Sequence, residues 1–133
     1  MELRVESEWR KVDFVKRRYH DLIAWQRSIA LAKQVYSLTE RFPDSEPYGL
    51  VSQMRRAAVS VASNIAEGAS RASKREFAQF LNIAKGSLSE LETQLTIAEE
   101  LQLAPKDDKL REQLDDLFGL LNGLINSLRR SDR

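Results

Sequence analysis

The chain has 133 residues, the size of one ordinary domain, and 42% of them are hydrophobic while 31% are charged. It can therefore form a core, and it is too apolar overall to be disordered. It contains no cysteine, which excludes a disulfide framework, a thiolate metal site and a cysteine nucleophile. The apolar runs are short and the first residues hold no apolar signal region, so we expect a bacterial cytoplasmic protein without a membrane span.

Positive charge gathers in the middle of the chain, although 21 basic and 20 acidic residues leave a net charge of only +1. Residues 47–75 hold five basic residues and one acidic residue, a balance of +4, whereas residues 76–133 have a balance of −4. Such a polarity can orient a partner or a neighbouring subunit. The alternative is that solvated helix faces simply differ in sign.

Apolar residues at three- and four-residue spacing predict a first helix over residues 22–42. Pro43 ends it, because the residue before a proline is pushed away from helical angles. A second helix is predicted over about residues 47–67, with Gly68 as its C-terminal stop.

The firmest helix start is an S-x-x-E capping box, in which Ser73 and Glu76 satisfy each other's backbone donors. The third predicted helix runs from this box to about residue 103. The fourth is predicted from leucines that alternate steps of four and three residues over 110–128, the last two being Leu124 and Leu128.

The segments show no sustained period-two alternation, and their short connections force each helix to fold back on its predecessor. The sequence therefore predicts an all-α fold, an antiparallel up-down-up-down four-helix bundle over residues 21–130. Residues 1–20 lie outside the pattern, and we expect them to form an N-terminal extension, either a short helix or a mobile arm.

The third predicted helix carries more apolar surface than one core needs. Its core stripe runs from Phe77 to Leu95, and a second stripe lies well away from it at about 100° per residue. That second stripe consists of Ile83, Gly86, Glu90, Ile97 and Leu101. Extra apolar faces on a small bundle indicate subunit contacts, so we expect a homo-oligomer. The alternative is that loop and arm residues, such as Trp9, cover the stripe within one chain.

Polar side chains follow one edge of the second predicted helix. Unpaired polar groups at a core margin cost about 1–3 kcal/mol each, so they are expected to be hydrogen-bonded. We predict a structural polar network between helices or subunits, made of Gln53, Ser60, Asn64 and Glu67. A contact with a ligand or nucleic acid is the alternative.

The candidate nucleic-acid contacts are Arg55, Arg56, Arg71, Lys74 and Arg75. The last three flank the turn before the third helix, where free backbone N–H groups and the helix dipole favour a phosphate. Repeated around an oligomer, they would form a ring of positive charge that binds RNA or DNA backbone in a salt-sensitive way. The sequence has no RNA-reading aromatic motif or zinc finger, so little base specificity is expected.

The sequence predicts no enzyme, no metal site and no cofactor. His20 is the only histidine, and it lies beside Asp21 at the start of the first helix, where a surface or capping role is expected. The chain holds no Glu-x-x-His pair, glycine-rich phosphate loop or G-x-S-x-G turn.

Many distinctive positions between about residues 20 and 101 resemble the 23S rRNA intervening-sequence proteins, a bacterial family of four-helix bundles. The matching runs include Asp21-Leu22, Trp25-Gln26, Phe42-Pro43, Tyr48-Gly49-Leu50, Arg55-Arg56-Ala57-Ala58, Asn64-Ile65-Ala66-Glu67-Gly68, Gly86-Ser87 and Glu90-Leu91-Glu92.

This resemblance implies a bundle that assembles into a ring-like homopentamer. The family is also similar to the accessory variability proteins of diversity-generating retroelements, which are pentameric bundles that bind nucleic acid and a reverse transcriptase. We therefore interpret the chain as a non-enzymatic self-assembling bundle that contacts RNA or DNA backbone through its basic segment. The competing interpretation is a protein-interaction scaffold with no nucleic-acid role, in which Arg55, Arg56 and Arg71 form salt bridges between subunits.

Overall fold

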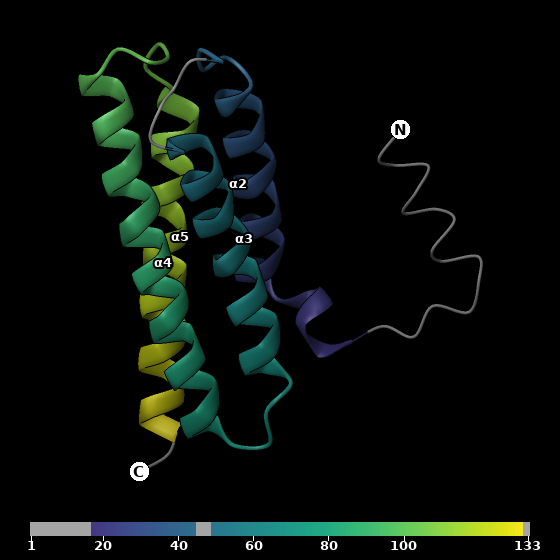
Figure 1. Ribbon diagram of the computed structural model, residues 1–133. Helices are drawn as coiled ribbons and strands as arrows, with labels where there is room; N and C mark the ends of the chain where they lie inside the picture. Colours follow the sequence, from purple (N-terminus) through teal and green to yellow (C-terminus); the bar gives the residue numbers. More distant parts are fainter. Residues whose placement is uncertain (1–16, 45–48, 132–133) are drawn as a thin grey trace.

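The computed structural model describes residues 17–44 and 49–131, and over these the regular secondary structure is entirely helical (Figure 1). The elements are a short 3₁₀ turn, η1 (Arg18–Asp21), and the α-helices α2 (Ile23–Thr39), α3 (Leu50–Ala69), α4 (Lys74–Glu100) and α5 (Asp108–Ser131). Consecutive helices run in opposite directions and pack side by side, and contacts between α2 and α5 close the four into a bundle. This confirms the predicted all-α up-down architecture. Most of the predicted N-terminal extension lies outside the described residues.

The core lies along the axis of the bundle and is built by one stripe from each helix. The predicted core stripe of α4 is buried, and it consists of Phe77, Leu81, Ala84, Leu88, Leu91 and Leu95. On α5 the buried leucines are Leu110, Leu114, Leu117 and Leu121. Beyond Leu121 the prediction needs correction, because Ile125 is the buried residue and Leu124 is only half-buried. An α-helix has 3.6 residues per turn, so a strict alternation of three and four residues drifts away from the core.

Gly68 does not stop α3, contrary to the prediction, because the helix continues to Ala69. A Cβ atom on Gly68 would lie 2.6 Å from Cβ of Phe80 on α4. The absence of a side chain at Gly68 therefore allows α3 and α4 to pack closely at this point. Glycine's conformational freedom is used instead at Gly49, whose φ of 66° places it in the left-handed region just before α3 begins.

The remaining helix ends either agree with the predictions or differ from them by a few residues. α2 ends at Thr39, where the threonine hydroxyl donates to the carbonyl oxygen of Val35 at 2.8 Å. α4 begins after Ser73 as predicted, and Ser73 Oγ accepts a hydrogen bond from the Glu76 backbone N–H at 3.1 Å. The Glu76 carboxylate does not complete the predicted box, since it accepts from the Ser73 hydroxyl at 3.3 Å. α4 ends at Glu100, about three residues before its predicted end.

Candidate functional site

The second apolar stripe of α4 lies on the surface of the described bundle. Ile83, Ile97 and Leu101 are 52%, 45% and 59% exposed, and Gly86 and Glu90 are exposed as well. At about 100° per residue these five residues fall within an arc of about 60°. We call them the α4 ridge. Trp9, which was considered as a cover for them, lies outside the described residues.

Three polar side chains join α3 to α4 at the edge of the core. Ser60 and Ser87 share a hydrogen bond of 2.8 Å between their Oγ atoms. Asn64 Nδ2 donates to both the carbonyl oxygen and Oγ of Ser60, at 2.8 and 3.0 Å. Ser87 was not predicted as part of this network, because only the packing of α3 against α4 shows that it faces Ser60.

The other two residues of the predicted polar network lie elsewhere on α3. Glu67 forms an ion pair of 2.8 Å with Arg71, one helical turn further along the chain. Gln53 lies about two turns before Ser60, and its side chain is exposed. The structure therefore brings Ser60 and Asn64 together and leaves Gln53 and Glu67 outside their network.

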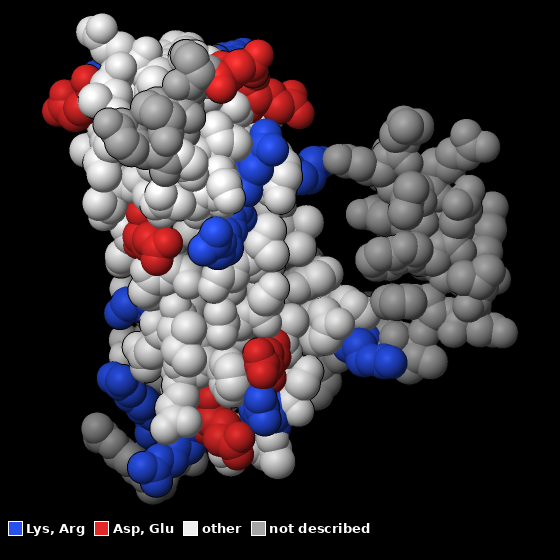
Figure 2. Space-filling model, viewed as in Figure 1, with Lys and Arg blue, Asp and Glu red and all other residues white. Residues whose placement is uncertain are grey.

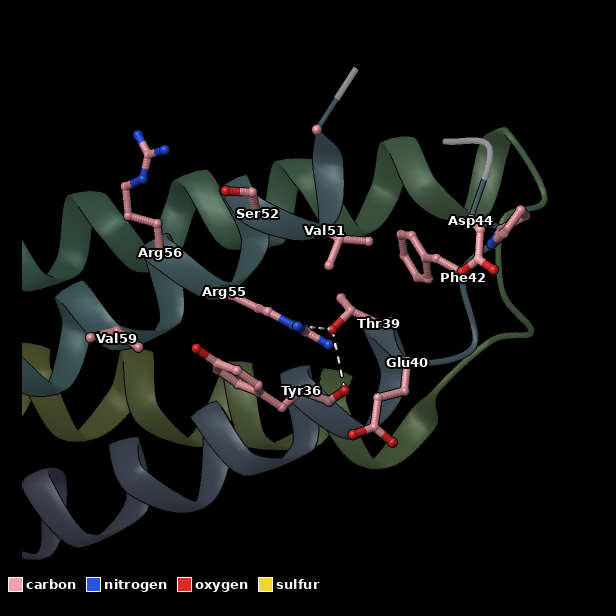
Figure 3. Close-up of a pocket in the computed structure, with 12 residues that line it drawn as sticks. Tyr36, Thr39, Glu40, Phe42, Asp44, Val51, Ser52, Arg55, Arg56 and Val59 are labelled. Carbon is pink, nitrogen blue, oxygen red and sulfur yellow. Dashed lines mark hydrogen bonds between the residues drawn. The ribbon is translucent and has the colours of Figure 1, made fainter. Parts of the chain in front are cut away.

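Arg55 and Arg56 lie beside an open groove of about 770 Å³ between α2 and α3 (Figure 3). Arg55 Nε donates to Thr39 Oγ1 at 2.9 Å, and its guanidinium lies 4.5 Å from the centre of the Tyr36 ring. Arg56 stands at the rim with its side chain pointing away from Tyr36. Glu40 also lines the groove, so the groove carries both signs of charge.

Arg71, Lys74 and Arg75 lie at the other end of α3, where α4 begins. At 1.5 Å per residue Arg56 is about 20 Å from that end, so the five predicted cations do not form one patch. Arg71 is already compensated, because Glu67 pairs with it and its guanidinium lies 4.8 Å from the centre of the Phe80 ring. In the described part of the chain, no hydrogen bond or ion pair engages the side chains of Lys74 and Arg75.

The end of α5 adds two further cations, Arg129 and Arg130, to this end of the bundle. Lysine and arginine side chains gather at the lower end of the molecule in Figure 2, where Figure 1 shows α4 beginning and α5 ending. A cleft of about 200 Å³ lies there, lined by Lys74, Arg75, Ala78, Gln79, Asn82, Leu128 and Arg129. Arg129 was not among the predicted site residues, although antiparallel packing of the last two helices places it near Lys74.

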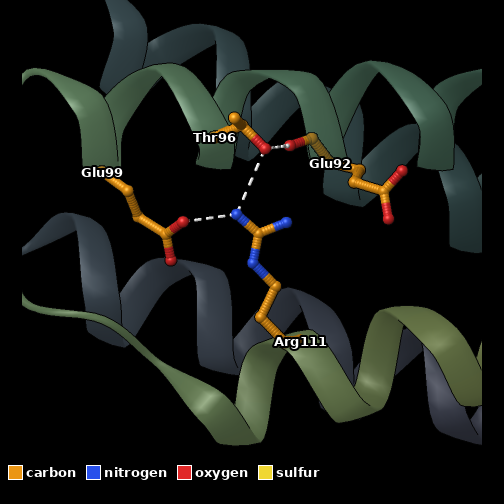
Figure 4. A network of polar contacts seen from close by, with 4 residues as sticks. All are labelled: Glu92, Thr96, Glu99 and Arg111. Carbon is orange, nitrogen blue, oxygen red and sulfur yellow. Dashed lines mark hydrogen bonds and ion pairs between the residues drawn. The ribbon is translucent and has the colours of Figure 1, made fainter.

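Polar contacts between α4 and α5 join the helices at the opposite end of the bundle (Figure 4). Arg111 Nη2 donates to Glu99 Oε1 at 2.5 Å and to Thr96 Oγ1 at 3.2 Å. The Thr96 hydroxyl in turn donates to the backbone carbonyl of Glu92 at 3.0 Å. These bonds hold two helices together, and among the described residues no three His, Asp or Glu side chains are grouped so as to hold a metal ion.

His20 has the capping geometry that was expected as one of its two roles. Its Nδ1 accepts a hydrogen bond of 2.8 Å from the backbone N–H of Arg17, at the start of η1. Its ring contacts those of Tyr19 and Trp25, with centroids 4.5 and 5.3 Å away. The imidazole is thus part of the junction between η1 and α2.

Comparisons with known proteins show the fold through a solved structure and the family through a family model. The fold is similar to that in a crystal structure of a protein of unknown function from the S23 ribosomal protein family, from Bacteroides thetaiotaomicron VPI-5482. The two superimpose with a TM-score of 0.72 and 20% sequence identity, over 78% of this chain and 96% of the other. A comparison with curated proteins finds no significant match. None of the described helices is long and apolar enough to cross a membrane. The family model described as 23S rRNA-intervening sequence protein matches residues 20–123, which confirms the resemblance, and the chain belongs to that family.

Proposed function

We propose that the chain is a non-enzymatic helical bundle that assembles with copies of itself and contacts RNA or DNA backbone with its basic end. The observation that carries the assembly is the α4 ridge, whose three large apolar side chains are about half exposed on the side away from the core. A homopentameric ring is the assembly that we propose, in keeping with the family resemblance.

The groove between α2 and α3 is a suitable partner for the ridge. A closed ring requires two different surfaces of the same subunit to meet. Tyr36 and Val59 line the groove and are exposed, which offers apolar area on another face of the bundle. Arg56 at the groove rim and Glu90 on the ridge carry opposite charges, so this pairing is electrostatically complementary.

Size-exclusion chromatography with light scattering tests the assembly. The wild-type chain is expected to elute as an oligomer, and Ile97→Glu, which places a charge in the ridge, is expected to yield monomers with unchanged helicity. Ile23→Glu is the matched control, since Ile23 is an isoleucine of similar exposure, 55%, on α2. A wild-type monomer at micromolar concentration, or an Ile97→Glu oligomer of wild-type size, contradicts the proposal.

Nucleic-acid binding is supported by the uncompensated cations at the basic end. Lys74 and Arg75 are exposed and engaged by no side-chain partner in the described ranges, and Arg129 lies beside them in the same cleft. Several copies in a ring would add these charges together, and phosphate contacts accumulate into strongly salt-dependent affinity.

The competing scaffold function is favoured by a different observation. Arg55 and Arg71 are fixed within their own subunit by Thr39, Tyr36 and Glu67, which withdraws two of the predicted cations from a polyanion. Their intrachain contacts also argue against the predicted use of these two arginines in subunit salt bridges.

Filter binding with a structured RNA at two salt concentrations separates the two functions. Lys74→Ala combined with Arg75→Ala is expected to weaken binding and to reduce its salt dependence. Lys106→Ala combined with Lys109→Ala is the matched control, because these exposed lysines lie at the opposite end of α5. Absence of wild-type binding at low salt rejects the nucleic-acid function and leaves the scaffold.

A further inference from the structure

We infer that the cleft between the start of α4 and the end of α5 is a binding site for a single phosphate group. Its charged residues are Lys74, Arg75 and Arg129. That this phosphate belongs to a nucleic acid rests on the proposed function. Phosphate binding itself can be tested with inorganic phosphate alone.

The described residues that line the cleft carry charge of one sign. Their three ionisable side chains are all cationic and come from two different helices. Among the described residues, no hydrogen bond or ion pair engages these three side chains. Three uncompensated cations facing one small space repel each other, and an anion placed between them relieves that repulsion.

The lining also supplies the hydrogen-bond chemistry that a phosphate needs. The guanidinium groups of Arg75 and Arg129 can each donate two parallel hydrogen bonds to phosphate oxygens, and Lys74 adds a compact positive charge. The amide groups of Gln79 and Asn82 stand in the same lining. Asn82 Nδ2 donates to the carbonyl oxygen of Ala78 at 3.1 Å, and its second N–H remains for a ligand.

The size of the cleft selects a small anion. Its volume of about 200 Å³ is below the range of about 300–1,000 Å³ that is usual for pockets that hold larger organic ligands. Ala78 and Leu128 form an apolar part of the wall. The cleft therefore fits one phosphate better than it fits a whole nucleotide.

Titration with inorganic phosphate tests the site on the protein alone. The probe is the side-chain amide signals of Gln79 and Asn82 in ¹⁵N–¹H TROSY spectra, with sodium chloride of equal ionic strength as the reference. Saturable shifts are expected for the wild type and for Arg130→Gln, because Arg130 does not line the cleft. The shifts are expected to be lost in Arg129→Gln, and their absence in the wild type or their persistence in Arg129→Gln overturns the inference.

Binding of a single-stranded RNA oligonucleotide then identifies the source of the phosphate. Arg129→Gln is expected to weaken RNA binding about tenfold, the loss typical of a charge-assisted contact, and Arg130→Gln less than threefold. Phosphate binding without RNA binding rejects the nucleic-acid function and keeps the phosphate site. Conversely, RNA binding that is equal in the wild type and Arg129→Gln rejects the cleft as the RNA contact and keeps the proposed function.

Discussion

Gly68 on α3 faces Phe80 on α4 so closely that a Cβ atom on the glycine would lie 2.6 Å from the Phe80 Cβ. The Phe80 Cβ is bonded to the backbone and cannot turn away, so Gly68→Ala must push the two helices apart. We expect this variant to lose about 1–3 kcal/mol of the free energy of unfolding, although alanine favours helices by about 1 kcal/mol over glycine. Urea denaturation at one fixed protein concentration measures the loss, since assembly couples to stability.

Gly123→Ala is the matched control for this substitution. Gly123 also lies inside a helix, but a Cβ atom there would meet nothing within 4 Å. The free energy of unfolding is therefore expected to rise by up to about 1 kcal/mol, through helix propensity alone. A loss of stability in Gly123→Ala similar to that in Gly68→Ala would show that close packing is not the cause.

The architecture could be predicted because it depends on local and repeated signals. Apolar spacing of three and four residues identified four helices, and short connections fixed their direction. Gly68 shows the limit of such rules, because a glycine near a helix end serves equally well as a stop or as a contact point. Only the neighbouring helix decides between the two, and its position is not written in the residues around Gly68.

The candidate site could be predicted only in part, for the same reason. The α4 ridge was identified because its residues share one helix and one face. Arg71 was predicted as a nucleic-acid contact, and the structure adds that it pairs with Glu67 one turn away. Arg129 and Ser87 were missed because their roles depend on contacts with residues far away in the sequence, which helix periodicity does not reveal.

The hydrogen bond between Ser60 and Ser87 is expected to stabilise the contact of α3 with α4. Ser87→Ala removes a partner from the half-buried Ser60 hydroxyl, and we expect a loss of about 1 kcal/mol in the free energy of unfolding. A double-mutant cycle with Ser60→Ala measures the coupling directly, with an expected interaction energy of about 0.5–1.5 kcal/mol. Strictly additive losses would show that the two hydroxyl groups do not stabilise each other.

Ser73 is expected to set the start of α4. Ser73→Ala removes the hydroxyl that accepts from the Glu76 backbone N–H, at a cost of about 1 kcal/mol in the free energy of unfolding. Ser73→Asp retains an acceptor and is expected to stay close to the wild type. If both variants unfold at the same urea concentration, the side-chain oxygen at position 73 does not stabilise the start of α4.

Arg111 and Arg27 each form an ion pair that reaches α5, and the two pairs differ in their exposure to solvent. The side chains of Arg111 and Glu99 are 32% and 20% exposed, whereas those of Arg27 and Asp116 are 56% and 44% exposed. Water and salt screen the second pair more strongly, and exposed ion pairs contribute about 0–1 kcal/mol. Arg111→Gln is therefore expected to lower the free energy of unfolding by about 1.5 kcal/mol, because Thr96 loses its hydrogen bond from Arg111 as well. Arg27→Gln is expected to lower it by less than about 0.5 kcal/mol. Thermal and urea unfolding of both variants, at low and at high salt, measures the difference. Equal losses of the free energy of unfolding in the two variants would show that burial does not determine the strength of these ion pairs.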